Sequence, residues 1–112
     1  NDDICFQEIY QRDSHILNID KQTMPDKYKL YKNFPNPFNP TTNIKFDLPE
    51  PGFISLDIYN IKGQYIYNIV EGYLPPGQHQ FKFNGDNLSS GIYFVILKSD
   101  ASILSNKMVL LK

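Results

Sequence analysis

Side chains that could carry chemistry are few in this 112-residue sequence, and their spacing favours no catalytic site. A hydrolytic triad needs a nucleophile, a base and an orienting group within hydrogen-bond reach. His79 alternates with Phe81 in a strand-like run, which is typical of a histidine at the rim of a core, and His15 has no serine or cysteine motif beside it. Cys5 is the single cysteine, so it can form no intrachain disulfide, and no second ligand is spaced for zinc. We therefore expect no enzyme and no cofactor.

Two further groups of side chains could bind a ligand, but each has a simpler interpretation. Residues 84–87 (Asn-Gly-Asp-Asn) offer oxygen ligands. Calcium loops, however, present more carboxylates at fixed spacing, and these residue types are frequent in turns. Tyr65, Tyr67 and Tyr73 could form a platform for sugars, yet tyrosine is also common in half-exposed strands. We therefore expect a turn at residues 84–87 and ordinary strand tyrosines.

Charge and hydropathy exclude two other classes of protein. The 11 basic and 12 acidic residues give a net charge of −1, and the lysines are spread singly, so we expect no nucleic-acid partner. The longest apolar run, residues 92–97, is far shorter than the roughly 20 residues of a membrane-spanning helix. We therefore expect no transmembrane segment, and we expect any signal peptide to have been removed or to lie upstream of this sequence.

Charge is divided unevenly along the chain, which predicts a boundary near Pro25. Residues 1–26 carry six acidic residues against Arg12 and Lys21, whereas residues 27–112 carry nine lysines against six acidic residues. We interpret residues 1–26 as an acidic lead-in, which is a linker, the tail of an upstream domain or an added strand pair. Residues 27–112 are then the domain proper.

Hydrophobic residues from Tyr28 onward recur with a period of two, which predicts β-strands. Residues 92–97 are apolar on both faces, as in a strand that is covered on each side. Turn signals separate the runs at intervals of about 8–12 residues, which indicates an all-β fold, an antiparallel β-sandwich of about seven strands. The predicted core residues are Ile44, Phe46, Ile54, Leu56, Ile58, Ile66, Ile69, Phe81, Phe83, Tyr93, Val95 and Leu97.

Three prolines interrupt residues 33–41 and fix the backbone at their positions. Such a segment cannot donate a full ladder of hydrogen bonds, so we expect a stiff crossing loop or a sheet edge. We expect Phe34 and Phe38 to fill the end of the sandwich.

A series of motifs follows in a distinctive order, and each would be weak evidence alone. They occupy residues 30–42, 44–49, 58–64, 74–79, 88–94 and 107–112. In combination, over about residues 28–112, they resemble the type A C-terminal sorting domains of the type IX secretion system.

The resemblance implies a seven-stranded immunoglobulin-like sandwich that follows a secreted cargo protein, with residues 1–26 as the cargo tail or linker. It implies that the domain ends its protein. After export to the periplasm, the outer-membrane translocon would recognise the folded domain. A sortase-like peptidase would then remove it as the cargo reaches the cell surface or the medium. The positions implied in translocon recognition are Pro35, Asn36, Pro37, Gly91, Lys107, Met108, Val109, Leu110, Leu111 and Lys112.

Strand alternation would set Met108 and Leu110 on the face opposite Lys107. The Lys112 side chain would then remain free for recognition by a partner protein. The alternative function is a structural spacer or a carbohydrate-binding immunoglobulin-like module of an extracellular enzyme. Position discriminates between the two functions, because a spacer can lie anywhere in a chain whereas a sorting label must end it.

Overall fold

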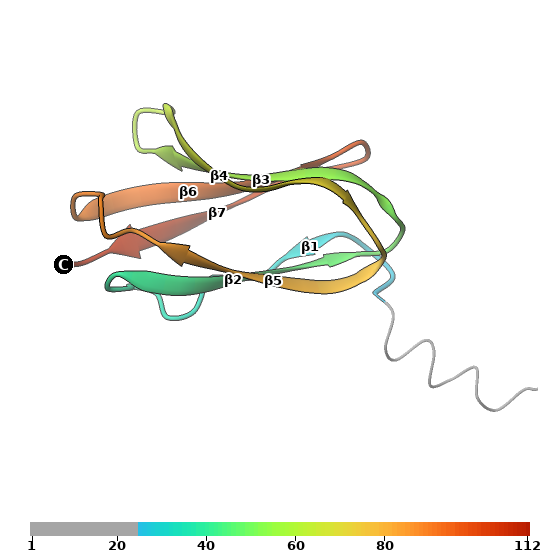
Figure 1. The fold of residues 1–112 in the computed structure, drawn as a ribbon, viewed down its shortest axis with the longest axis horizontal. Coiled ribbons are helices and arrows are strands. Elements are labelled where there is room, and N and C mark those ends of the chain that lie inside the picture. The colour runs from blue at the N-terminus through green and yellow to red at the C-terminus, as the bar shows by residue number, and fades with distance from the viewer. Residues whose placement is uncertain (1–24) are drawn as a thin grey trace, which may run out of the picture.

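The computed structural model describes residues 25–112, which form two β-sheets packed face to face (Figure 1). Strands β1 (Lys29–Leu30), β2 (Thr41–Leu48) and β5 (Gly77–Asn84) form one sheet in the order β1-β2-β5. Strands β3 (Gly52–Asn60), β4 (Tyr65–Leu74), β6 (Gly91–Ser99) and β7 (Ile103–Leu110) form the other in the order β4-β3-β6-β7. All of these pairings are antiparallel. The predicted seven-stranded antiparallel β-sandwich is confirmed, and its strand order is of the immunoglobulin-like type.

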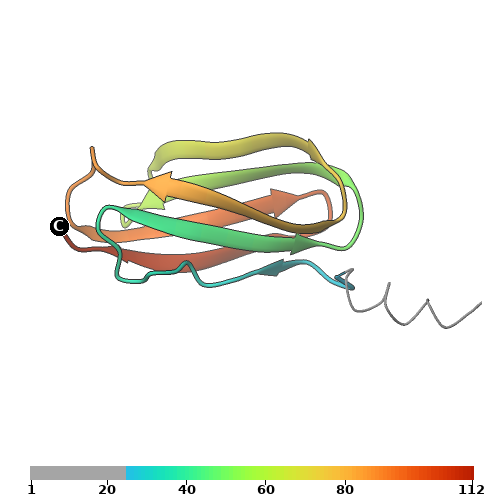
Figure 2. The ribbon, with the colours of Figure 1, turned by 60° about the horizontal axis from the view of Figure 1, so that its bottom comes forward.

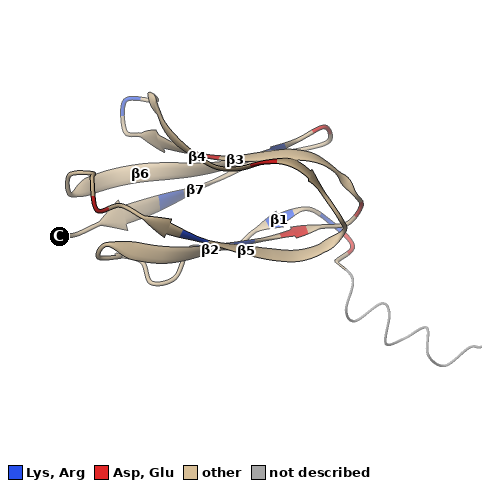
Figure 3. Cartoon of the chain, in the orientation of Figure 1, with Lys and Arg blue, Asp and Glu red and all other residues tan. Residues whose placement is uncertain are grey.

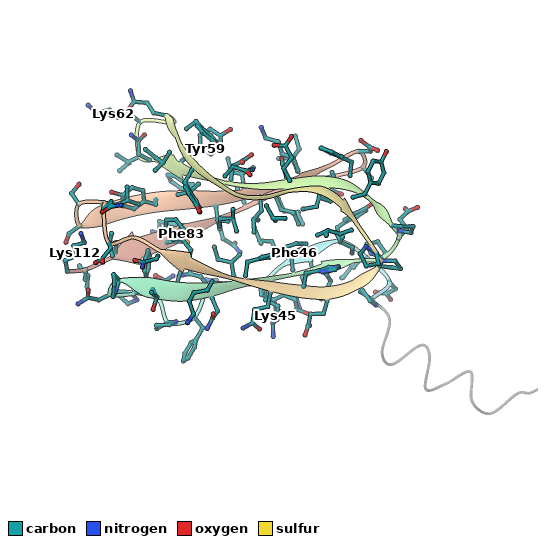
Figure 4. The ribbon with its side chains drawn as sticks, viewed as in Figure 1. Lys45, Phe46, Tyr59, Lys62, Phe83 and Lys112 are labelled. Carbon is teal, nitrogen blue, oxygen red and sulfur yellow. The ribbon has the colours of Figure 1, made fainter. Side chains whose placement is uncertain are left out.

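Apolar alternation places one face of each sheet in a shared core. In β2, Ile44, Phe46 and Leu48 are fully buried, whereas Lys45 points away from the opposite sheet (Figure 4). Strands β2, β3 and β6 supply most of the core because each has a neighbouring strand on both sides. The buried hydrophobic residues are Phe38, Ile44, Phe46, Leu48, Ile54, Leu56, Ile58, Phe83, Tyr93, Val95, Leu97, Met108 and Leu110.

Three residues predicted in the core lie at its margin instead. Ile66 and Ile69 belong to β4, an edge strand whose register against β3 shifts between Leu56 and Asp57, and both are half-buried. Phe81 lies in β5, the edge strand of the other sheet, and stacks on Phe46 with ring centroids 5.9 Å apart. An edge strand has a neighbour on one side only, so its inward side chains stay partly open to water.

The proline-rich segment is a crossing loop between β1 and β2, as predicted, but its two phenylalanines differ. Phe38 is 1% exposed and belongs to the core. Phe34 is 78% exposed, so the prediction that it fills the end of the sandwich is wrong. The backbone of Phe34 pairs with Asn43 through hydrogen bonds of 3.1 and 2.9 Å. Directly paired residues project to the same face, and Asn43 lies on the outer face of β2.

Several predictions fall on residues 1–24, outside the described residues. They are the possible strand pair and the interpretations of Cys5 and His15. The domain boundary between residues 26 and 27 also stays a prediction.

Candidate functional site

Strand β7 lies at one edge of its sheet and pairs with β6 along one side. Gly91, at the start of β6, is opposite Leu110, and Tyr93 is opposite Met108. The ladder therefore brings Gly91 next to the last strand, which the sequence motifs also single out. The outer side of an edge strand presents N–H and C=O groups that no neighbouring strand satisfies.

The crossing loop covers this edge, and Figure 2 shows the segment after β1 running beside β7. Asn36 Oδ1 accepts a hydrogen bond from the Val109 N–H at 3.0 Å, and Asn36 Nδ2 donates to the Lys107 carbonyl at 3.5 Å. Phe38 continues the contact with its backbone. Its N–H donates to the Val109 carbonyl at 2.9 Å, and its carbonyl accepts from the Leu111 N–H at 3.0 Å. The Asn36 amide thus takes the place of a strand residue. We call the five residues joined by these bonds the sealed edge: Asn36, Phe38, Lys107, Val109 and Leu111.

A buried polar network holds the loop in place. Asn33 is 3% exposed, and its Nδ2 donates to Thr42 Oγ1 at 3.0 Å and to the Pro35 carbonyl at 3.2 Å. The Thr42 hydroxyl donates to the same carbonyl at 2.9 Å. These bonds tie the start of the loop to β2 and so position Asn36 against β7. Sequence reasoning missed Asn33 and Thr42, because residue type alone suggests a solvent-exposed turn.

Phe38 anchors the loop in the core. It packs edge-on to Phe83 with ring centroids 6.1 Å apart. Gly85 lies beside it, and the Gly85 N–H donates to the Pro40 carbonyl at 2.8 Å. A Cβ atom at Gly85 would lie 3.2 Å from Leu110 Cδ2 and 3.4 Å from Phe38 Cε2. Gly85 was predicted as a turn residue, and the structure adds that a side chain here would crowd Leu110 and Phe38.

The faces of β7 follow the predicted alternation. Met108 and Leu110 are fully buried, whereas Lys107 is exposed on the opposite face. Val109 is half-buried and Leu111 is 54% exposed. The last strand therefore presents a cationic and apolar outer face to solvent.

Lys112 differs from its prediction, because it is exposed but not free. Its backbone N–H donates to Ser90 Oγ at 3.0 Å, and its ammonium group donates to the Asp86 carbonyl. Both partners lie in the loop before β6, so these bonds tie Lys112 back to the domain.

Most of the residues that the family resemblance implies in translocon recognition lie at one end of the sandwich. Asn36, Gly91 and the last strand are in contact or adjacent, while Pro35 and Pro37 fix the backbone on both sides of Asn36. A role of these residues in translocon recognition stays a prediction.

The candidates for catalysis have structural explanations. The His79 ring stacks on Phe46 with centroids 5.5 Å apart, and its Nε2 lies 2.8 Å from the Pro75 carbonyl. Since a carbonyl can only accept, Nε2 carries the proton of this bond. His79 is therefore a rim histidine with a satisfied donor, as predicted.

Residues 84–87 form the predicted turn, in which the Asp86 N–H donates to Asn84 Oδ1 at 2.9 Å. Within residues 25–112, no cluster of three or more His, Cys, Asp or Glu side chains is arranged to hold a metal ion. The same described part of the chain contains no helix long and apolar enough to cross a membrane.

The three exposed tyrosines of β4 do not form one platform. Tyr65 and Tyr73 pack against aromatic residues near opposite ends of β3, whereas Tyr67 packs against Phe83 of the facing sheet. This separation favours their interpretation as strand residues.

A polar cluster stabilises the outer face of β1 and β2. The Tyr31 hydroxyl donates to Asp47 Oδ2 at 2.6 Å, and the ammonium groups of Lys29 and Lys45 lie 4.4 and 4.7 Å from the Tyr31 ring centroid. The hydrogen bond to Asp47, followed by desolvation, raises the pKa of Tyr31 above its usual value. The cluster explains why Asp47 is buried on a face that is otherwise wet.

Comparisons with known proteins agree with the sequence motifs. The family model described as "Secretion system C-terminal sorting domain" matches residues 32–111. No curated protein matches the sequence. A solved structure of PorZ, a bacterial surface component of the type IX secretion system of Porphyromonas gingivalis, is similar with a TM-score of 0.50 and 17% sequence identity. The similarity covers 78% of this chain and 12% of PorZ, and it shows the fold.

The family match spans β2 to β7 and includes the whole sealed edge. The chain therefore belongs to the family of secretion system C-terminal sorting domains, the C-terminal secretion signals of the type IX system.

Proposed function

We propose that the type IX translocon in the outer membrane recognises the last strand together with the loop that seals it. One observation carries the proposal: the Asn36 side chain bonds to the backbone of Lys107 and Val109, which joins the first and last motifs into one surface. The domain follows a cargo protein, passes through the periplasm, and reaches the cell surface or the medium. A sortase-like peptidase removes it there.

Export of a fusion protein tests this proposal. Residues 1–112 are placed behind a fluorescent protein that enters the periplasm through the Sec pathway, in a host that has the type IX machinery. We expect fluorescence outside the cell for the native sequence. Lys107→Ala should retain the fusion in the periplasm, because it removes the exposed charge of the last strand.

Lys82→Ala is the matched control, since Lys82 is an exposed lysine on the opposite sheet. Substitution of either exposed lysine should alter the free energy of unfolding by no more than about 0.5 kcal/mol, so thermal melts can separate misfolding from lost recognition. Normal export of both variants and of a chain lacking residues 107–112 would refute the proposal and favour the spacer function.

A further inference from the structure

Strand β6 is apolar on both faces, which predicts cover on both sides. Its inward side chains Tyr93, Val95 and Leu97 lie in the core. Its outward side chains, by alternation, include Phe94 and Ile96, which are only half-buried. Residues 25–112 form two layers, and neither layer covers this outer face (Figure 1).

An open groove runs over this uncovered face. It is lined by Tyr59, Ile61, Phe94, Ile96, Lys98 and Ile103, and we call it the outer groove. Ile61 and Ile103 stand at its border and are 65% and 71% exposed. The groove thus combines half-buried apolar side chains at its base with large exposed ones at its rim. Grouped apolar exposure of this kind marks interaction sites, whereas isolated exposed apolar residues are ordinary.

The opposite outer face of the same molecule provides an internal comparison. The outward side chains of β2 and β5 are polar, and they include Lys45, Gln78, Gln80 and Lys82. Phe34 is a single large apolar side chain exposed on that side. A sheet face in contact with water is normally polar. The face of β2 and β5 therefore fits exposure to water, whereas the apolar side chains of the outer groove do not.

Cations border the outer groove. The Lys98 ammonium lies 5.8 Å from the Tyr59 ring centroid, inside the groove. Lys107 is opposite Phe94 in the β6–β7 ladder, so it projects to the same face. Figures 3 and 4 show the basic position in the β3–β4 loop, Lys62, which follows Ile61.

Two acidic residues project to this face outside the groove lining: Asp57 on β3, and Glu71 on β4, which is opposite Ser55 and so one strand farther from Lys98. Asp57 is opposite Ile96, but it is 8% exposed and its Oδ1 accepts a hydrogen bond from Asn68 Nδ2 at 2.7 Å. The charged side chain in the groove lining is Lys98, and Lys107 adjoins it across the ladder from Phe94, so this side of the groove is positively charged and a complementary partner carries carboxylates.

We propose that the outer groove docks a protein of the export machinery that presents apolar side chains flanked by carboxylates. The apolar side chains contact Phe94 and Ile96, and the carboxylates pair with Lys98 and Lys107. A second copy of this chain is a poorer fit, because two identical grooves would bring cationic borders together. The inference rests on the proposed function, since the domain meets this partner during export.

Site-specific crosslinking in the exported fusion tests the groove. A photo-crosslinking amino acid replaces Ile61 or Ile103, and Phe34 on the opposite face serves as the matched control. Crosslinks from positions 61 and 103, but not from 34, to an outer-membrane protein of the type IX machinery would support the proposal. A crosslink to a second copy or to upstream residues of the same fusion would overturn it, as would no crosslink from an exported fusion.

Charge reversal tests the complementarity. Lys98→Glu should lower the crosslink yield from position 103 by about tenfold, because it places a carboxylate against carboxylates, whereas Lys82→Glu should leave the yield unchanged. Equal yields for the two variants would overturn the predicted partner chemistry. A native fusion that stays in the periplasm would refute the proposed function and this inference with it. An exported fusion without groove crosslinks would refute this inference alone.

Discussion

Asn36→Ala removes the side chain that stands in for a strand residue at the sealed edge. The hydrogen bond from the Val109 N–H is 3.0 Å long, whereas the bond to the Lys107 carbonyl is 3.5 Å long and contributes little. A typical hydrogen bond contributes about 0.5–1.5 kcal/mol net, and water can replace Asn36 at this exposed site. We therefore expect a loss of about 1 kcal/mol, which lowers the melting midpoint by roughly 4–8 °C in a domain of this size.

Asn39→Ala is a close control, because Asn39 is also an exposed asparagine before a proline in the same loop. It should change the free energy of unfolding by less than about 0.5 kcal/mol. Amide hydrogen exchange gives a local measurement: Asn36→Ala should accelerate exchange at Val109 and leave Leu110, whose amide faces β6, protected. Equal melting midpoints for the two variants, with unchanged exchange at Val109, would show that Asn36 does not seal the edge.

Three further variants probe the core, the crowded loop and the polar cluster. Leu56→Ala, at a fully buried position, should cost about 2–5 kcal/mol in urea denaturation, and an unchanged midpoint would contradict its place in the core. Gly85→Val should cost about 1–3 kcal/mol, because its side chain would collide with Leu110 and Phe38, and a native-like melt would refute that contact. The hydrogen bond to Asp47 raises the pKa of Tyr31. The stabilising effect of this bond is therefore complete below about pH 10 and declines as pH rises through the raised pKa. Denaturation between pH 9 and pH 11 should therefore show a shallower decline for Tyr31→Phe than for the native chain, and equal slopes would contradict the assignment.

Alternation predicted the strands and most of the core, because burial of one sheet face requires an apolar residue at every second position of a strand. It succeeded for Ile44, Phe46 and Leu56, which lie in strands with two neighbours. It overestimated the burial of Ile66, because the sequence does not show that β4 is an edge strand. Phe34 failed for a related reason: its side-chain direction depends on pairing with Asn43, and a proline-rich segment carries no period from which to read that direction.

The contacts of the candidate site could not be predicted from local sequence. Asn36 and Val109 are 73 positions apart, so no short motif indicates that a side-chain amide of one bonds to the backbone of the other. Motif resemblance singled out both segments as candidates for recognition, and that role stays a prediction. The structure supplies the physical link, since the loop satisfies backbone groups that the last strand would otherwise leave open.

The sealed edge also restricts how a partner can contact the last strand. A partner that added its own strand to β7 would have to displace Phe38, whose burial contributes roughly 1.5–3 kcal/mol, and break both backbone bonds to Val109 and Leu111. The outward side chains of β7 require no such rearrangement. Lys107 lies opposite Phe94, which lines the outer groove, so the face of the last strand and the groove form one continuous surface. A partner that binds through this face can therefore contact the folded domain while Asn36 keeps the edge closed. Such binding would break fewer native contacts than strand addition to β7.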